Sequence, residues 1–467
     1  MLIRRAELPG RGETDVRLRA GRIAEIGANL SRARGEPELE AGGGALLPGL
    51  HDHHIHLFAL AAAAGSIDCG PAAVRNAEGL RAALARAATT GSGWLRGVAY
   101  HECVAGDLDR ARLDAWVPRR PLRIQHRSGA LWVLNSAALA ALGAERDPAP
   151  AGLERDASGR PTGRLYRGDD WLRARGGDAP PGLGAVGARL AALGITGITD
   201  AGAGNGAEAM AELCAAVGSG ALPQRLRVMG TPELPAPPAS LRARVARGAV
   251  KLLLDEARLP ELDRLVETLR EAHAAGRAAA LHCATRTEVL FALAALRAAG
   301  AHRGDRLEHA SVAPPEAVAE AAALGLRVVS QPHFLAERGE QYAADVAPED
   351  LPWLYRGRAW LDAGVPLAAG SDAPYGSPDP WASMRAAVER RSGAGRPLAP
   401  DEALVPEQAL ALFTAPADDP GGPPRKIEPG APAELCLLDR PWREARLRLR
   451  AEDVAASFCA GRPVHRR

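Results

Sequence analysis

Between residues 190 and 370, short apolar runs alternate with segments that have the pattern of helices. The runs that we interpret as strands are 194–200, 225–230, 249–254, 278–282, 306–309, 326–330 and 366–370. Segments rich in Ala, Leu, Arg and Glu, such as 260–275 and 287–299, lie between them. Strands separated by single helices predict parallel βαβ units. The strand before His51 adds an eighth, which is the number that closes a (β/α)8 TIM-like barrel.

The two ends of the chain have a different pattern. Residues 14–27 alternate polar and apolar side chains around a glycine-containing turn, which predicts a β-hairpin, and residues 433–439 are strand-like after a Pro/Gly-rich breaker. We therefore expect both termini to build one small domain. The predicted α/β chain has three domains: a β-sandwich (1–47 and 415–467), the barrel (48–64 and 190–414), and an insertion that covers the active site (65–189).

Composition excludes several classes of protein. The net charge of +2 is too small to indicate binding to nucleic acid or to a membrane surface. The N-terminus lacks the apolar run of a signal peptide, and the apolar stretch near 57–64 is too short to span a bilayer. Six cysteines lack CxxC spacing, so neither a disulfide framework nor a structural zinc site is indicated. We expect a soluble, cytoplasmic protein, and its oligomeric state stays open.

Histidines follow the apolar run at 45–47 and the turn signal Pro48-Gly49. Because side chains of a strand alternate between its faces, His54 and His56 should point the same way, about 7 Å apart along the strand. Two neutral imidazoles on one face can share a divalent metal, although a solvated histidine-rich turn is the alternative. We expect the neighbouring residues 51–53 to pack beside the ligands.

Lysine is rare in this chain: of 58 basic residues only Lys251 and Lys426 are lysines. Lysine can lose its proton when desolvated and can then react with CO2, whereas a guanidinium stays charged. Lys426 lies among turn residues, but Lys251 lies in an apolar strand. An ion pair of Lys251 with Asp255 or Glu256 is the alternative to a functional role.

Three further residues that can bind metal end predicted strands, namely His282, His309 and Asp372. Each has an alternative: the histidines could be structural, and Asp372 could cap a turn or a helix. Barrel enzymes carry their chemistry at the C-terminal ends of the strands, however. We therefore expect these residues to converge with His54, His56 and Lys251.

These residues carry a family resemblance. The pattern Pro48-Gly49-x-x-Asp52-x-His54-x-His56, the later lysine and two histidines, and Gly370-Ser371-Asp372-Ala373-Pro374 resemble the amidohydrolase superfamily. The resemblance is closer to its family 3 branch, which includes deformylase-like and exoenzyme-regulator-like proteins. Further matching segments lie along nearly the whole chain: Leu134-Asn135-Ser136-x-x-Leu139, Thr162-Gly163, Gly194-Ile195-Thr196, Arg306-Leu307-Glu308-His309 and Asp379-Pro380-Trp381.

The resemblance implies roles for six residues. His54 and His56 would bind one metal together with Asp372, and His282 and His309 would bind a second. A carboxylated Lys251 would bridge the two ions, which would activate hydroxide as the nucleophile. Asp372 would take up the proton and pass it to the leaving amine. The ligand types favour Zn2+, with one or two ions and with Mn2+ or Fe2+ as alternatives.

Two departures from the family pattern concern the substrate. Ser128-Gly129-Ala130 stands where relatives often have Ser-Gly-His, and Cys283-Ala284 follows His282 where they often have Gly-Asp. Candidate substrate contacts are Arg127, Trp132, Tyr166, Arg286 and Arg338. The arginines would favour a carboxylate-bearing substrate, although each could also be a surface residue.

The leading interpretation is a metal-dependent hydrolase of a C–N bond in a small amide, cyclic amide or deaminable heterocycle. The same activated hydroxide would also attack an ester, a lactone or a phosphoester, which is the alternative among enzymes. A catalytically silent scaffold is the alternative from another class. Such a scaffold would be expected to lose ligands, and this chain retains all six.

Overall fold

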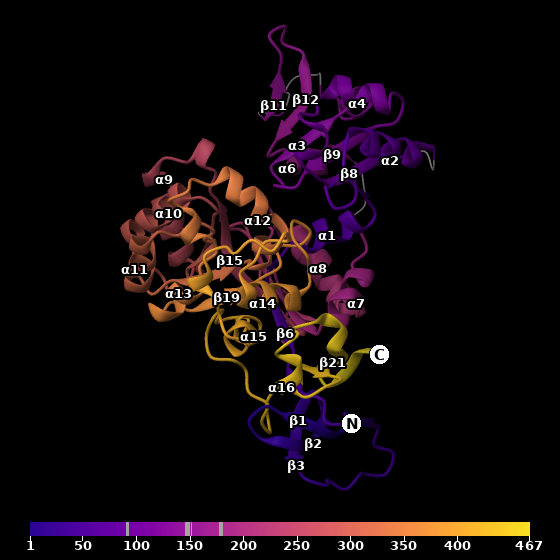
Figure 1. Cartoon of the computed structure of the whole chain (residues 1–467), viewed down its shortest axis with the longest axis vertical. Coiled ribbons are helices and arrows are strands. Elements are labelled where there is room, and N and C mark those ends of the chain that lie inside the picture. The colour runs from indigo at the N-terminus through magenta and orange to yellow at the C-terminus, as the bar shows by residue number, and fades with distance from the viewer. Residues whose placement is uncertain (90–92, 145–149, 151, 177–180) are drawn as a thin grey trace. The chain divides into compact units, whose positions relative to one another are not determined.

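The computed structural model describes residues 1–89, 93–144, 150, 152–176 and 181–467. The chain divides into two compact units: one combines Met1–Leu57 with Leu183–Arg467, and the other is Phe58–Gly182 (Figure 1). Among the described residues, no helix has the length and apolar character needed to cross a bilayer.

The first unit contains an eight-stranded, wholly parallel sheet. Its strands, in their spatial order, are β6 (Leu50–Ile55), β13 (Ile195–Asp200), β14 (Arg225–Gly230), β15 (Val245–Leu253), β16 (Ala279–Cys283), β17 (Arg306–His309), β18 (Arg327–Ser330) and β19 (Leu367–Ala369). The first and last strands meet, because the N–H of Asp372 donates to the carbonyl of His54 at 2.7 Å and that of His56 to Ala373 at 2.9 Å. The predicted (β/α)8 barrel is confirmed.

Helices follow the barrel strands and lie outside them (Figure 1). They are α7 (Gly184–Ala192), α8 (Ala207–Ser219), α9 (Leu262–Ala274), α10 (Arg286–Ala299), α11 (Pro315–Ala323), α12 (His333–Asp345), α13 (Arg358–Asp362), α14 (Pro380–Glu389) and α15 (Pro406–Thr414). Local sequence sets their starts: Thr285 and Glu288 form a capping box at α10, and Pro315 occupies the first turn of α11. Helix α9 buries one face, with Leu265 and Leu269 on it.

The first barrel strand in chain order lies at a different position from the one predicted before His51. The apolar run at 45–47 contributes to β5 (Leu46–Pro48), which pairs with a strand of the small domain, and the histidine-bearing β6 is itself the barrel strand. The chain passes from one sheet to the other at Gly49, where a Cβ would lie 2.3 Å from Oγ1 of Thr196. A short apolar run next to a glycine does not reveal which of two sheets it joins.

The two chain ends build a β-sandwich, as predicted. One sheet has the order β3 (Arg22–Gly27), β2 (Gly12–Arg19), β1 (Leu2–Leu8) and β4 (Glu38–Glu40), and the other β22 (Arg462–Arg466), β21 (Val454–Cys459), β20 (Leu435–Leu438) and β5. Side chains of both sheets share one core, including Ile3, Val16, Leu437 and Phe458. Helix α16 (Trp442–Ala445) lies between β20 and β21 in the sequence.

The second unit has a mixed six-stranded sheet. Its spatial order is β11 (Leu153–Arg155), β12 (Pro161–Tyr166), β10 (Leu131–Leu134), β9 (Leu122–His126), β8 (Leu95–Tyr100) and β7 (Ile67–Asp68). Strands β7, β8 and β9 are parallel and the other pairs antiparallel. The helices are α1 (Leu57–Ala64), which begins at the unit boundary, α2 (Ala77–Thr89), α3 (Glu102–Ala105), α4 (Arg110–Trp116), α5 (Ser136–Ala141) and α6 (Asp169–Gly176). That this segment covers the barrel mouth stays a prediction.

Candidate metal centre

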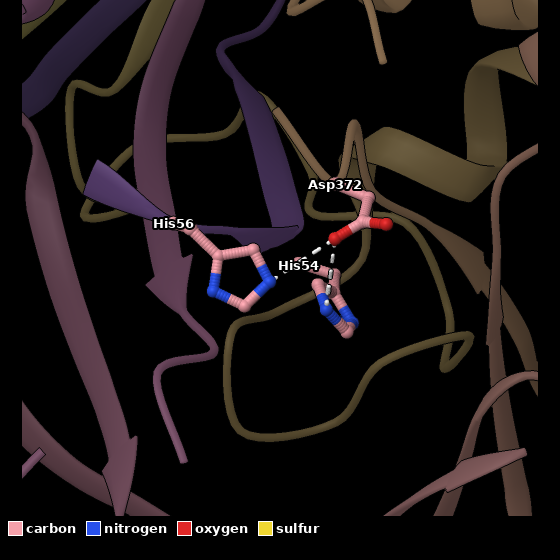
Figure 2. A group of neighbouring side chains, drawn as sticks. All are labelled: His54, His56 and Asp372. Atoms are coloured by element: carbon pink, nitrogen blue, oxygen red, sulfur yellow. Dashed lines mark hydrogen bonds and ion pairs between the residues drawn. The ribbon is translucent and has the colours of Figure 1, made fainter. Parts of the chain in front are cut away.

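His54, His56 and Asp372 converge at the junction of the first and last barrel strands (Figure 2). Oδ1 of Asp372 lies 3.1 Å from Nε2 of His56 and 3.5 Å from Nε2 of His54. All three ligand atoms lie within 4.8 Å of one another, which is compact enough for a single ion. Two imidazole nitrogens and a carboxylate oxygen are a donor set typical of zinc enzymes.

The backbone around Asp372 allows this close approach. A Cβ on Gly370 would lie 2.4 Å from the backbone nitrogen of His54, so a larger residue there would push the last strand away from the first. Asp372 itself has a φ of +51°, which is uncommon for a residue other than glycine. Strained backbone of this kind clusters at functional sites.

Electrostatics keep this centre in a state suited to a cation. Burial, together with the charge of the neighbouring Lys251, lowers the pKa of His54 to about 3, so the imidazole is neutral. Burial alone would raise the pKa of Asp372. The hydrogen bond with His56 and the nearby imidazoles outweigh that effect and hold this pKa below its ordinary value, so the carboxylate is ionised.

Glu308 orients the His54 ring through Nδ1, the ring nitrogen that does not face Asp372. Its Oε2 contacts Nδ1 of His54, which leaves Nε2 directed at Asp372, and its Oε1 accepts from Nε of Arg306. Glu308 is fully buried, and Arg306 also donates to the carbonyl of His53 at 2.8 Å. Carboxylates that hold the distal nitrogen of a histidine ligand fix its tautomer and raise its basicity.

The rings of His282 and His309 extend the cluster of imidazoles. Ring centroids are 4.4 Å apart between His282 and His309, 4.9 Å between His309 and His54, and 5.3 Å between His54 and His56. Nδ1 of His309 lies 2.8 Å from Oε1 of Gln331, which orients that ring as Glu308 orients His54. Burial lowers the pKa of both His282 and His309, which keeps them neutral.

Lys251 is buried, and its Nζ has no hydrogen-bond partner among the described residues. Burial lowers the pKa of this amine, although the charge of Glu308 acts in the opposite direction. The alternative ion pair does not form: Asp255 accepts the N–H of Ala257 at 3.2 Å, and Glu256 accepts from Thr287 at 3.0 Å. A buried amine without a partner beside neutral imidazoles fits a site that takes metal with a carboxylated lysine.

The candidate substrate contacts lie in different surroundings. Trp132 is buried in the core of the second unit and donates from Nε1 to Asp169 at 3.0 Å, so its surroundings are those of a structural residue. Tyr166 is 42% exposed at the end of β12, and Arg127 follows β9 in the same unit.

The two candidates in the barrel unit both make polar contacts. Arg286 pairs with Asp350 at 2.9 Å, and Arg338 donates to the carbonyl of Tyr375. The ring of Tyr375 packs on His56 with centroids 5.4 Å apart, so of these two arginines Arg338 is the one held to the segment beside the metal ligands.

Sequence reasoning predicted that Asp52 packs beside the ligands, but it missed the supporting roles of Glu308 and Gln331. Glu308 and Gln331 orient two histidines, and Oδ1 of Asp52 accepts from the N–H groups of His54 at 3.1 Å and Ser371 at 3.0 Å. A carboxylate inside a predicted barrel strand, as at Glu308, is itself a signal, because such groups are seldom buried without a partner.

Comparisons with known proteins agree with this geometry. A family model described as "Amidohydrolase family" matches residues 38–465. N-substituted formamide deformylase of Arthrobacter pascens is 29% identical over 494 residues, which cover 90% of this chain and 89% of that protein.

Two solved structures share the fold. An uncharacterized metal-dependent hydrolase from Pyrococcus horikoshii has a TM-score of 0.74 and 21% identity, over 94% of this chain and 97% of that chain. Atrazine chlorohydrolase from Arthrobacter aurescens TC1, complexed with zinc, has a TM-score of 0.58 and 15% identity, over 100% of this chain and 95% of that chain.

Proposed function

Because the chain belongs to the amidohydrolase family, and so is a metal-dependent hydrolase of carbon–nitrogen bonds other than peptide bonds, we propose that it cleaves a small amide, cyclic amide or deaminable heterocycle at the centre around Asp372. The observation that carries this proposal is the convergence of His54, His56 and Asp372 within 4.8 Å at the seam of the barrel. The ionised carboxylate of Asp372 and the neutral imidazole of His54 are in the protonation states that ligation requires.

Six residues would hold the metal. In this proposal His54, His56 and Asp372 bind one divalent ion, and His282 and His309 bind a second. Lys251, as its carbamate, would supply an anionic oxygen ligand. Burial favours the neutral amine that carbamate formation needs. Mixed imidazole and carboxylate ligands favour Zn2+, with Mn2+ and Fe2+ as alternatives and with one or two ions per chain.

The metal, when bound, would acidify a water molecule and polarise the bond under attack. The residues of the chain handle the proton. Asp372, a carboxylate in contact with His56, can accept the proton of the attacking water on a carboxylate oxygen and deliver it to the leaving nitrogen. For an amide, the C–N bond breaks as a C–O bond forms, and the products are a carboxylic acid and an amine. Glu308 keeps His54 in one tautomer throughout.

The relative that acts on N-substituted formamides suggests the first substrates to test. Arg338, which is held to Tyr375 beside His56, is the candidate to meet a carboxylate on the substrate. Arg127, Tyr166 and Arg286 remain candidates for outer contacts with the substrate.

The test is a substrate profile of the zinc-loaded full-length protein. N-substituted formamides, cyclic amides and amino-heterocycles would be compared with esters, lactones and phosphoesters of matched size. We expect turnover of a C–N substrate that is lost in Asp372→Asn, and loss of both metal and turnover in His54→Ala. Turnover of esters or phosphoesters alone would favour the alternative chemistry, whereas bound metal without turnover across the profile would favour a scaffold.

A further inference from the structure

A second group of metal-ligand residues lies in the Phe58–Gly182 unit, namely His101, Glu102 and His126. His126 is the last residue of β9, and His101 directly follows β8. These strands are parallel neighbours, with Tyr100 in register with His126. The group therefore lies at the carboxyl ends of two adjacent parallel strands, which is where open α/β sheets bind their ligands.

The spacing of this group matches the spacing at the barrel. Oε2 of Glu102 lies 3.1 Å from Nε2 of His126 and 3.5 Å from Nε2 of His101, and these are the two distances that separate Asp372 from His56 and His54. Zinc bonds of about 2.0–2.1 Å in a tetrahedron place ligand atoms roughly 3.3 Å apart. One carboxylate oxygen and two imidazole nitrogens are thus already near the separations that a single ion imposes.

The surroundings of the group suit a partly open site. The side chains of His101 and His126 are each 16% exposed, whereas that of Glu102 is 44% exposed, so solvent reaches the carboxylate. Nδ1 of His126 accepts the N–H of Ser128 at 3.2 Å and lies 2.7 Å from Oγ of Ser128. When Nε2 binds a metal and the ring proton sits on Nδ1, this Oγ can accept the hydrogen bond from Nδ1 in place of the backbone contact. Two histidines and one glutamate with an open fourth position are also the protein ligands of several zinc enzymes.

We propose that His101, Glu102 and His126 bind one divalent transition-metal ion, preferably Zn2+, with water completing its coordination. This group shares no residue with the barrel centre. Binding requires that the Nε2 atoms facing Glu102 give up any protons they carry, so affinity should fall as the pH is lowered. When Nε2 of a neutral His101 binds a metal, the ring proton sits on Nδ1. His101 then also loses the weak hydrogen bond in which its Nδ1 accepts the N–H of Cys103 at 3.2 Å.

The test is zinc stoichiometry of the full-length protein, by elemental analysis after dialysis against buffered Zn2+. Zinc content is compared with and without His126→Ala in the same background. The difference then reports only the second site, regardless of how much zinc the barrel centre binds. In a His54→Ala/His282→Ala background, we expect about one equivalent that disappears when His126→Ala is added. In the wild-type background, His126→Ala should remove one equivalent and leave the barrel metal in place.

Two further variants guard against misfolding. Glu102→Gln keeps the shape of the side chain and should weaken zinc binding by at least tenfold, and Ser128→Ala should weaken it about tenfold, as losses of outer partners do. His465→Ala, on β22 and outside both groups, is the matched histidine control and should leave the stoichiometry unchanged. Equal zinc content with and without His126→Ala, in proteins of unchanged circular dichroism, would overturn the proposal.

Discussion

Replacing Lys251 with methionine should separate the stability of the metal-free protein from its capacity to bind metal. Lys251 is 4% exposed and its Nζ has no hydrogen-bond partner among the described residues, so the metal-free fold pays for a buried, unsatisfied amine. A penalty of that kind is about 1–3 kcal/mol. Lys251→Met keeps most of the volume and removes the amine. We therefore expect the variant to be more stable than the wild type by about that amount in a chelator.

The order should reverse when metal is added. Ions that bind only the folded protein stabilise it by about 4 kcal/mol at a concentration a thousandfold above Kd, and a variant that has lost the lysine ligand forgoes the part that depends on it. The assay is denaturant unfolding of both proteins, with chelator and with zinc, beside elemental analysis. Lys426→Met is the matched control because Lys426 is exposed, and it should change neither curve. A Lys251→Met protein that is less stable in chelator, yet binds as much zinc as the wild type, would refute the reasoning.

Two companion variants test whether the amine acts as a carbamate. Lys251→Ala should lose the second metal and most activity, and short-chain carboxylic acids should partly restore both by supplying an oxygen anion in the vacated space. Lys251→Arg should be no better than alanine, because a guanidinium does not react with CO2. Full activity in Lys251→Arg would mean that only positive charge is needed at this position.

The remaining predictions concern the support of the site and of the β-sandwich. Gly370→Ala should lower the melting temperature and the metal content, because its Cβ would lie 2.4 Å from the backbone of His54, whereas Gly206→Ala, with nothing within 4 Å, should be tolerated. Glu308→Gln should reduce zinc affinity by roughly 10–100-fold and destabilise the fold by about 3–5 kcal/mol, since Arg306 loses its buried partner; unchanged values in calorimetry and zinc titration would contradict this. Asp15→Asn should cost about 1 kcal/mol at neutral pH. Burial raises the pKa of Asp15, but hydrogen bonds from Arg5, Arg4 and Leu30 outweigh that and lower it from 3.8, so the stabilisation is present above that pH and is lost as the pH falls through the folded pKa. A difference between wild type and Asp15→Asn that persisted in strong acid would show another origin.

Much of the barrel could be predicted from sequence because each strand and its helix are local patterns. The predicted strand 225–230 coincides with β14 and 306–309 with β17, since strands that alternate with helix-patterned segments are marked by the local rhythm of the sequence. The first barrel strand was misplaced because the choice between β5 and β6 depends on partners hundreds of residues away. Pairing of that kind leaves no local trace.

The site shows the same division. Residues at strand ends could be named from position and residue type, and the structure brings His54, His56 and Asp372 within 4.8 Å. Their supports could not be found, because the contact of Glu308 with His54 joins residues 254 positions apart. Trp132 illustrates a different limit: its residue type suits a substrate contact, but only packing reveals that it belongs to a core.

The seam between β6 and β19 would give a metal bound there a role in assembly. His56 and Asp372 are 316 positions apart, and they directly follow β6 and closely follow β19, the first and last strands of the barrel. An ion held by both would close a loop of 316 residues, and long loops of this kind are where a cross-link offsets the most chain entropy. A growing chain cannot complete this site until its eighth strand has emerged. Metal capture would therefore coincide with the final docking step of the barrel, and removal of the ion should loosen the fold first along this seam.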